Sequence, residues 1–389
     1  MTTTGHAGHV LPMVPFARAW QRAGHDVLVA APGERSRDVE RAGLPLRPFE
    51  EPDEESTAAL WGRVAQASPD EAGTIVMSRI FAGHKLDAAL PGILEAVRDW
   101  RPDVIVRESY ELAGAVAAER HGIPQVRIGP GLASTDEWMM ERAAGGGAEL
   151  PMEAIHRSPF LTLTPPALDD PAAPAPARIH RFRDDPVLPA PLPDWWPGND
   201  DPLVYLSFGS VAGAMQFVFP GLYRAALEAL AELPARVLLT IGNDRDPGEL
   251  GPVPANVHVE RWVPQADVAA SAAVMVVHGG YGTTLGALTA AVPLVVVPLF
   301  ADQPQNARRV AELGAGIRLA EFGSVARLPE DVPPALERLG EAVQRVLGDP
   351  RYRRAARRVA ASAAALPRAD ASTGVLLAAV GGRADEIAA

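Results

Sequence analysis

The sequence predicts an α/β protein with two doubly wound domains, each a parallel sheet covered by helices on both faces. Short apolar runs alternate with helix-length amphipathic stretches in both halves of the chain, and a proline-rich stretch separates the halves. The 389 residues, 48% of them apolar, are enough to fill two cores. Ligands of such domains bind at the carboxyl ends of the strands, so we expect a site in a cleft between two facing domains.

In the first half, strands are predicted where short apolar runs are bounded by turn residues. They cover 25–32, 102–107, 124–128 and 160–164. Helices are predicted where apolar residues recur every three or four positions, over 12–23, 86–100 and 112–121. The stretches 61–84 and 130–150 show neither period and are predicted to be irregular.

The second half repeats the alternation more regularly. Strands are predicted over 203–208, 236–241, 257–261, 274–278 and 294–299. Helices are predicted over 219–233, 284–291, 303–313 and 334–347. Because every predicted strand here is followed by a helix or a long connection, the strands are expected to run parallel.

Proline marks the boundary between the halves. Residues 184–202 hold six prolines, which resist both a helix and a central strand. We predict a first domain over 1–185, a linker over 186–201, a second domain over 202–365, and a C-terminal helix over 366–389 that returns to the first domain. Residues 1–4 offer only the end of a first strand, which is normally central, so we expect the natural chain to have further residues upstream.

Composition excludes several classes of function. The net charge is −12 and basic residues form no dense cluster, so nucleic acid is not an expected partner. Cysteine is absent, which excludes disulfides, zinc–thiolate sites and cysteine nucleophiles. No apolar run is long enough for a membrane span and no secretory signal is visible. We expect a cytoplasmic protein, either a monomer or a homodimer.

The strongest motif follows the predicted strand 274–278. His278-Gly-Gly-Tyr-Gly-Thr-Thr284 leads from that strand into a helix. Glycines let backbone N–H groups approach an anion closely, and the start of the helix carries partial positive charge. The hydroxyls of Thr283 and Thr284 and the ring of His278 add donors, so the segment is predicted to bind phosphate. The alternative is a tight turn without a ligand.

Three neighbouring segments extend this motif into a family signature. Segment 261–265 (Arg-Trp-Val-Pro-Gln) precedes it, segment 298–306 follows it, and Gly-His-Val-Leu-Pro stands at 8–12. Together they resemble the nucleotide-sugar glycosyltransferases, and among these the actinobacterial natural-product enzymes. The resemblance spans nearly the whole chain. It implies the GT-B fold of two facing Rossmann-like domains, with the acceptor bound by the first and the donor by the second.

The resemblance also implies residue roles at the donor site. His278, Gly280, Gly282, Thr283 and Thr284 would contact the diphosphate. Trp262 would lie next to the base, with Gln265 as its polar neighbour, Asp302 and Gln303 would bind sugar hydroxyls, and Ser210 would contact phosphate or sugar. The alternatives are that Trp262 packs in a core and that Asp302-Gln303 caps a helix. The donor is a co-substrate, and no cofactor is expected.

One position departs from the related plant enzymes. These carry a glutamate eight positions after the histidine, where it binds the ribose hydroxyls, and this chain has Gly286 there. A deoxyribose nucleotide lacks the 2′-hydroxyl, so it would lose no contact when the glutamate is absent. The departure therefore favours a TDP-sugar over a UDP-sugar.

His9 is the predicted general base. It follows the residual first strand, and a histidine at a strand's carboxyl end can remove a proton from an acceptor hydroxyl at neutral pH. The resemblance gives His9 the same role, and His6 is the competing candidate. Glu108, at the end of another strand, is expected to orient the imidazole, unless it is a solvated carboxylate or pairs with Arg107. The resulting single displacement would invert the anomeric configuration.

The acceptor is expected to be small and hydrophobic. Trp61, Met77, Phe81 and Trp138 are the candidate contacts, although such residues are more often part of a core. No metal is expected, because Asp244-Arg-Asp246 lies in a Gly/Pro-rich turn and His6-x-x-His9 lacks further ligands.

Other functions remain open from the sequence. A GT-B sugar-nucleotide epimerase would share the phosphate loop without needing a base at His9. A catalytically silent homologue that assists a partner enzyme would not need His9 either. A dinucleotide oxidoreductase is disfavoured because no Gly-x-Gly-x-x-Gly opens the first domain.

Overall fold

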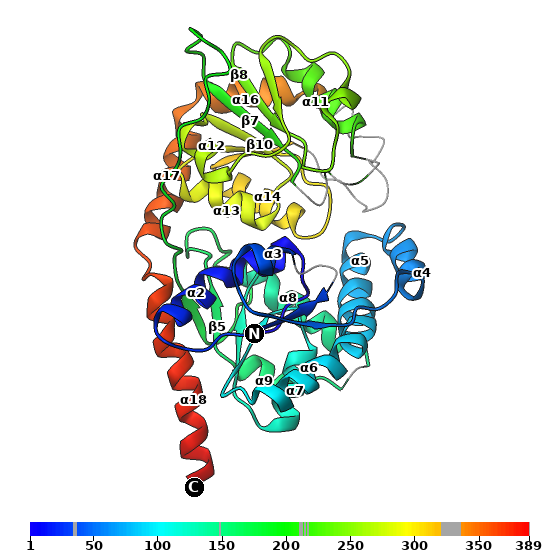
Figure 1. Ribbon diagram of the computed structural model, residues 1–389. Coiled ribbons are helices and arrows are strands. Elements are labelled where there is room, and N and C mark those ends of the chain that lie inside the picture. The colour runs from blue at the N-terminus through cyan, green and yellow to red at the C-terminus, as the bar shows by residue number, and fades with distance from the viewer. Residues whose placement is uncertain are drawn as a thin grey trace. The chain divides into compact units, whose positions relative to one another are not determined.

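The chain forms two compact units (Figure 1). The computed structural model describes residues 1–33, 37–147, 149–209, 213, 215, 218–319 and 336–388. The first unit comprises Met1–Asp185 and Ala365–Ala389, and the second comprises Pro186–Ala364. The C-terminal segment thus belongs to the first unit, whereas the proline-rich linker belongs to the second, where the Trp195 ring stacks on His258 at 4.6 Å.

The sheet of the first unit is parallel throughout its described strands. These are β1 (Val29–Pro32), β2 (Leu46–Phe49), β3 (Ile105–Glu108), β4 (Gln125–Ile128), β5 (Phe160–Thr162) and β6 (Ile179–Arg181). Thr2 bridges both Ala30 of β1 and Arg107 of β3, so the N-terminal segment lies between these two strands. The order is β2, β1, the Thr2 segment, β3, β4, β5 and β6.

The helices of the first unit pack on this sheet in some cases and on neighbouring helices in others. They are α1 (Ala7–Val10), η1 (Leu11–Met13), α2 (Val14–Arg22), α3 (Arg37–Arg41), α4 (Glu54–Val64), α5 (Pro69–Ile75), η3 (Val76–Lys85), α6 (Leu86–Trp100), α7 (Ala113–His121), α8 (Ala133–Ala144) and α9 (Met152–Arg157). Phe16 and Trp20 of α2 pack with Val126 and Leu161 of the strands. Helix α6 matches its predicted range, despite Pro91 in its interior.

Two stretches predicted to be irregular are mostly helical. Asp53 and Ser68 cap α4 and α5 by accepting backbone N–H groups, and Val76–Lys85 continues as a π-helix, η3. Helix α8 lies in the second stretch. A π-helix bonds residue i to i+5, so its apolar residues do not recur at the α-helical period by which the sequence was interpreted.

The second unit contains a six-stranded parallel sheet. Its strands are β7 (Leu203–Ser207), β8 (Arg236–Thr240), β9 (Val257–Glu260), β10 (Val274–Val277), β11 (Leu294–Val296) and β12 (Gly316–Arg318). Their order is β12-β11-β10-β7-β8-β9, the doubly wound order with its topological switch point between β7 and β10. Strands β2, β6 and β12 were not predicted, because short edge strands with polar residues carry no apolar run.

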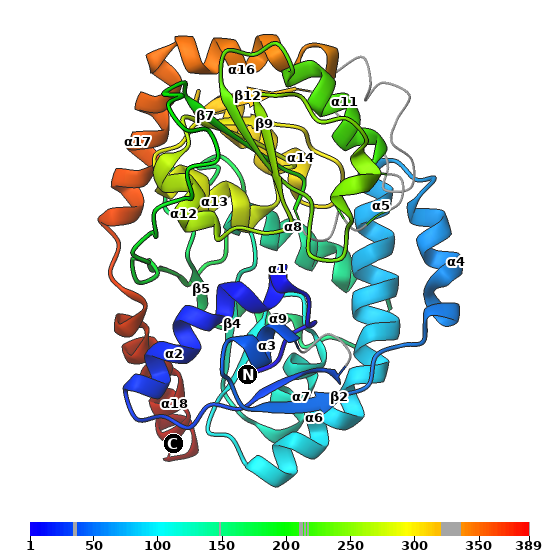
Figure 2. The ribbon, with the colours of Figure 1, turned by 45° about the horizontal axis from the view of Figure 1, so that its top comes forward.

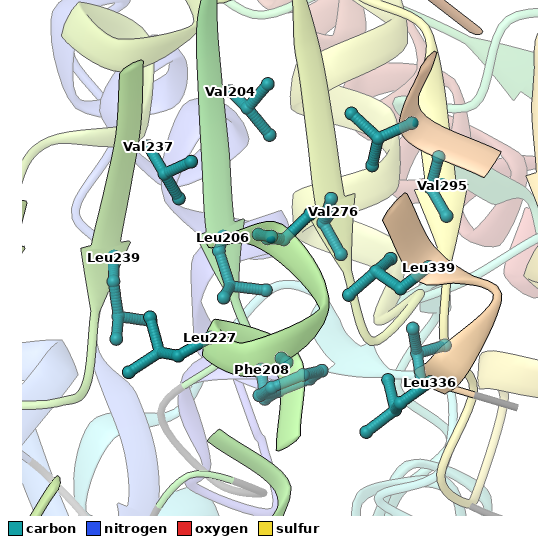
Figure 3. Close-up of a cluster of buried hydrophobic side chains, with 14 of the residues drawn as sticks. Val204, Leu206, Phe208, Leu227, Val237, Leu239, Val276, Val295, Leu336 and Leu339 are labelled. Carbon is teal, nitrogen blue, oxygen red and sulfur yellow. The ribbon is translucent and has the colours of Figure 1, made fainter. Parts of the chain in front are cut away.

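Helices cover both faces of this sheet (Figure 2). They are α11 (Gly221–Leu230), η4 (Pro247–Leu250), α12 (Gln265–Ser271), α13 (Tyr281–Thr289), α14 (Gln303–Glu312), α16 (Leu339–Gly348) and α17 (Pro350–Ala364). Leu227 of α11 and Leu339 of α16 belong to one core with Leu206, Val276 and Leu239 of the strands (Figure 3). Alternate residues of β7 and β10 therefore fill this core, which fixes the carboxyl ends of both strands.

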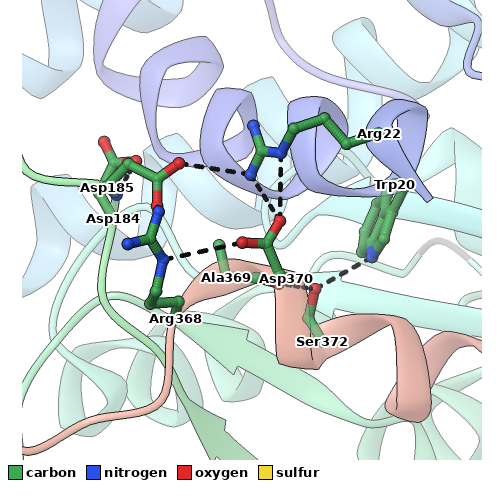
Figure 4. Close-up of polar contacts among 8 residues, drawn as sticks. All are labelled: Trp20, Arg22, Asp184, Asp185, Arg368, Ala369, Asp370 and Ser372. Carbon is green, nitrogen blue, oxygen red and sulfur yellow. Dashed lines mark hydrogen bonds and ion pairs between the residues drawn. The ribbon is translucent and has the colours of Figure 1, made fainter.

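The C-terminal segment is held to the first unit by polar contacts. It contains η5 (Ala369–Ser372) and α18 (Thr373–Ala388). Arg22 of α2 pairs with Asp370 at 2.6 Å, and Trp20 donates its indole N–H to the Ser372 hydroxyl at 3.0 Å (Figure 4). Arg368 pairs with Asp185 in the same group. Among the described residues, no helix has the length and apolar character needed to cross a membrane.

Candidate active site

In the first unit, His9 and Glu108 meet at the topological switch point of the sheet. The Thr2 segment and β3 are neighbours. After the Thr2 segment the next strands, β1 and β2, extend the sheet toward one edge, whereas after β3 the next strands, β4 to β6, extend it toward the other. Glu108 ends β3, and His9 lies in α1, the first helical turn after the Thr2 segment. His9 is thus helical, rather than in a loop at the strand end as expected, and His6 is the residue that precedes this helix as its N-cap.

The two side chains are within ion-pair distance. Nδ1 of His9 lies 3.1 Å from Oε2 of Glu108, and the two side chains are 23% and 0% exposed. The oxygen lies off the direction of the ring N–H, so the contact is not a linear hydrogen bond. Catalytic pairs often have such alignment before substrate binds. Nε2 is left as the ring atom that can receive an acceptor proton.

Glu108 is held in place by its neighbours. The backbone N–H of Tyr110 donates to Oε1 at 2.8 Å, and the Thr4 hydroxyl donates to Oε2 at 3.3 Å. Arg107, the alternative partner from the sequence, donates instead to Gln125 and to the carbonyls of Ser109 and Glu111. The Glu108 carboxylate is therefore available to His9.

Of the four predicted acceptor contacts, Phe81 is the one that lies beside His9. Its ring centroid is 6.3 Å from that of His9. Trp61 is 43% exposed on α4, and Trp138 on α8 stacks with the Arg142 guanidinium 3.3 Å from the ring centroid. Met77 is completely buried in a core cluster and presents no surface to a ligand, so the structure does not support its predicted contact.

In the second unit, the ring of His278 lies between two glycines at the equivalent switch point. A Cβ on Gly209, which follows β7, would lie 2.5 Å from Cε1 of His278, and a Cβ on Gly280 would lie 2.5 Å from Nε2. Gly209 also has φ +76°, a conformation that other residues rarely adopt. These glycines therefore make room for the imidazole itself, a role that the sequence interpretation had not given them.

Burial keeps His278 neutral. Its loss of solvation lowers the pKa of His278 to about 4, an effect that the backbone of Ser207 opposes only in part. At neutral pH the ring therefore has one N–H donor and no charge.

Helix α13 begins three residues earlier than predicted, so the glycine–threonine segment forms its first turn. Its N-cap is Gly280, which has no side chain with which to cap the helix. The backbone N–H groups of Gly282 and Thr283 lie in this first turn, where a helix supplies no acceptor. The hydroxyl of Thr284 is buried without a hydrogen-bond partner among the described residues. The arrangement is that of an anion site.

Asp302 and Gln303 accept hydrogen bonds from groups around the starts of α13 and α14. Oδ2 of Asp302 accepts from the Tyr281 N–H at 3.2 Å and from Asn306 at 2.7 Å. Gln303 is 4% exposed, and its Oε1 accepts from the N–H groups of Leu299 and Phe300. Asp302 thus ties the start of α13 to α14, and the amide oxygen of Gln303 shapes the loop before α14.

Trp262 and Gln265 have contrasting surroundings. Trp262 follows β9 and is 63% exposed, so it is not a core residue. Gln265 donates from Nε2 to the Thr283 carbonyl at 3.0 Å. A Cβ on Gly286 would lie 2.4 Å from that same nitrogen. The Gln265 amide therefore occupies the space where the glutamate of the plant enzymes would begin.

Two further predictions concern Ser210 and metal binding. Ser210 lies outside the described residues. Asp246 caps η4 by accepting the Gly248 N–H, while Glu249 accepts the Asp246 N–H in return. Among the described residues no group of three or more potential ligands could hold a metal ion.

The sequence interpretation missed a group of buried charged residues in β3, β4 and α8. Arg127 pairs with Asp136 at 2.8 Å, and both side chains are almost completely buried. Burial lowers the pKa of Arg107 to about 10, and the nearby Arg127 adds to the shift. Arginines inside predicted buried strands were the available signal, because a charge in a core needs a partner.

Comparisons with known proteins show the family to which the chain belongs. Residues 18–154 match the family described as "Erythromycin biosynthesis protein CIII-like, N-terminal domain", and residues 224–377 match the corresponding C-terminal domain. The L-demethylnoviosyl transferase of Streptomyces niveus is 31% identical over 388 residues, covering 92% of each chain. The elloramycin glycosyltransferase ElmGT of Streptomyces olivaceus is 31% identical, covering 92% of this chain and 91% of that one.

A solved structure supports the same assignment. The glycosyltransferase SsfS6 of Streptomyces sp. SF2575, complexed with thymidine diphosphate, has a TM-score of 0.71 and 26% identity, covering 95% of this chain and 96% of that one. The likeness confirms the predicted GT-B class of fold. The chain belongs to the EryCIII-like family and is a nucleotide-sugar glycosyltransferase of the kind found in natural-product pathways.

Proposed function

We propose that this enzyme transfers a sugar from a TDP-sugar to a hydroxyl of a small hydrophobic natural product, with inversion and without a metal or a cofactor. The observation that carries the proposal is the contact of His9 Nδ1 with Glu108 Oε2 at 3.1 Å. It leaves Nε2 of an oriented imidazole as a general base.

The proposed step is a single displacement. Nε2 of His9 takes the proton of the acceptor hydroxyl while the oxygen bonds to the anomeric carbon. The bond from that carbon to the diphosphate oxygen breaks, and the nucleoside diphosphate leaves with the electron pair. Because attack comes from the face opposite the leaving group, the anomeric configuration inverts. Glu108 stabilises the imidazolium that forms.

The α13 turn supplies the leaving-group stabilisation in this proposal. Charge develops on the diphosphate as the bond breaks, and preorganised donors aimed at it lower the barrier. The first-turn N–H groups of α13, the Thr284 hydroxyl and the neutral His278 ring are the donors. They act together with the helix dipole, so no metal ion is needed to balance the charge.

Two observations favour TDP over UDP. Gly286 and the Gln265 amide beside it leave no carboxylate for a ribose 2′-hydroxyl. In addition, the related SsfS6 structure contains thymidine diphosphate, and another relative is named TDP-daunosamine transferase.

The test is a transfer assay with TDP-glucose and UDP-glucose, a panel of hydroxylated aromatic acceptors and excess EDTA. We expect transfer with EDTA present, a lower KM for the TDP-sugar, and a product of β configuration from the α-linked donor. A product of retained configuration, or a requirement for added metal, contradicts the proposal. Conversion of the donor to another sugar nucleotide without acceptor would favour epimerase activity instead.

A further inference from the structure

A cavity in the first unit adjoins the rings around His9. It measures about 20 Å³, and its lining includes Phe81, Lys85, Glu51, Tyr110 and Thr4. This is space for about one water molecule, so it can hold a functional group but not a ring. Phe81 and Tyr110 lie 6.4 Å apart between ring centroids, and both are within 6.3 Å of the His9 ring.

The cavity holds the only lysine of the chain. Lys85 donates to Glu51 at 2.9 Å, and the two side chains are 18% and 17% exposed. The Lys85 ammonium also lies 5.4 Å from the centroid of Phe81, a cation–π distance. Ordering a long lysine side chain and removing much of its water costs free energy. An exposed ion pair contributes too little to offset that cost. This pair is mostly buried and also contacts the Phe81 ring. The pair is therefore a built feature of this cavity.

The backbone beside the pair is also unusual. Phe81 and Lys85 both come from η3, the π-helical stretch. π-Helical turns are rare and occur frequently at functional sites. Here the stretch carries an aromatic ring beside His9 and an ammonium group that contacts the same ring.

We propose that Lys85 and Glu51 determine acceptor specificity by binding a neutral hydroxy-ketone edge of a planar aromatic acceptor. The acceptor ring lies along Phe81 and Tyr110, with its reacting hydroxyl at His9. A ring carbonyl accepts from Lys85, and the hydroxyl next to that carbonyl donates to Glu51. The proposal rests on the proposed function for the role of His9, and it adds the chemical class of the acceptor.

The charged residues that line the cavity exclude an anionic or a cationic group at this edge of the acceptor. An anionic group would compete with Glu51 for the one ammonium and would face Glu50 and Glu111, which also line the cavity. A cationic group would be repelled by Lys85 and would find Glu51 already paired. A neutral group with an acceptor and a donor side by side matches both members of the pair without leaving a charge unpaired.

The test measures equilibrium binding of three planar compounds without any donor sugar. The first is a dihydroxyanthraquinone with one hydroxyl next to a ring carbonyl. The second is the monohydroxyanthraquinone that lacks this hydroxyl, and the third is a hydroxyanthracene without carbonyls. Dissociation constants come from titration calorimetry on the full chain, so the result does not depend on sugar transfer.

Lys85→Met should weaken binding of both anthraquinones by about 10-fold or more, because a hydrogen bond to a charged donor is lost, and should leave the hydroxyanthracene within about twofold. Glu51→Gln should weaken the dihydroxy compound alone. Arg79→Met, on the exposed side of the same π-helix, is the matched control and should change none of the three.

Equal weakening of all three compounds, no change in any, or failure of the wild-type chain to bind the dihydroxy compound overturns the proposal. If Lys85→Met does not fold, the double variant Lys85→Met/Glu51→Gln removes the pair without leaving one charge unpaired and must show the same loss for the dihydroxy compound. Selective binding without transfer in the assay above would refute the proposed function while leaving this inference standing.

Discussion

Nδ1 of His9, in the helical turn after the Thr2 segment, lies 3.1 Å from Oε2 of Glu108, which ends the neighbouring strand β3 at the switch point of the first sheet. In the second unit His278 and Gly209 occupy the corresponding strand ends, with the imidazole against the glycine. Each doubly wound unit thus places a histidine where ligands of this fold bind. Variants at or beside each histidine therefore separate their roles.

Replacing His9 with alanine should lower kcat by about 10²- to 10⁴-fold, the usual contribution of a general base. Binding of TDP should not change, because no donor contact is lost. Glu108→Gln keeps the shape of the side chain but removes the charge that stabilises the imidazolium, so a smaller loss is expected. Steady-state kinetics and TDP calorimetry provide the measurement, and near-normal turnover of His9→Ala would refute the base assignment.

Gly280→Ala should raise the KM for the nucleotide sugar by about 10-fold or more. The added Cβ would lie 2.5 Å from Nε2 of His278, so the ring must leave its place at the α13 turn and one donor to the diphosphate is lost. The acceptor KM should stay the same. Gly221→Ala, where a Cβ meets nothing within 4 Å, is the control. An unchanged donor KM would show that the His278 ring position does not matter for binding.

Trp262→Ala should weaken TDP binding by about 10-fold, because stacking of a base on an aromatic ring contributes roughly 1–3 kcal/mol. Trp262→Phe should recover most of this affinity. Trp100→Ala, another exposed tryptophan, serves as the control in the same calorimetric titration. If alanine and phenylalanine at position 262 have equal effects, stacking is not the role of this side chain.

Gly286→Glu alone should not create a UDP-sugar enzyme. Its Cβ would lie 2.4 Å from Nε2 of Gln265, so the new side chain displaces an amide that bonds to the Thr283 carbonyl. We expect weaker binding of both TDP and UDP. The double variant Gly286→Glu/Gln265→Ala has room for the carboxylate and should shift the ratio of dissociation constants toward UDP. A single variant that already prefers UDP would contradict the steric argument.

Acid should destabilise the second unit through His278. Above about pH 6.5 the imidazole is neutral in the folded and unfolded chains alike, whereas between pH 6.5 and 4 only the unfolded chain takes up the proton, because the folded pKa is about 4. The free energy of unfolding should fall by roughly 3 kcal/mol over this range from this group. Urea unfolding at pH 7 and 4.5 measures the effect.

The variant His278→Asn isolates this contribution from that of other groups. Any stability advantage of the wild-type chain over the variant should shrink as the pH falls, since asparagine does not titrate. An advantage that stays constant with pH would show that the folded chain binds the proton as readily as the unfolded chain.

The sequence by itself determined the class of fold, the family and the segments that carry the chemistry. Apolar runs such as 274–278 and 203–208 identify buried parallel strands, and polar or glycine residues directly after them identify the strand ends. Each of these signals lies within one short segment, so it can be identified in a single sequence without an alignment. They located His9, Glu108 and His278 together with the turn that follows it.

The tertiary structure decided which strand ends are neighbours and what each glycine accommodates. Parallel strands that pair are far apart in the chain, so no local pattern shows that Gly209 faces His278 or that Lys85 reaches Glu51. It also decided that Met77 is core while Phe81, from the same π-helix, lies beside His9. The environment of a side chain depends on packing between segments that are distant in the sequence. The periodicity of one segment carries no information about that packing.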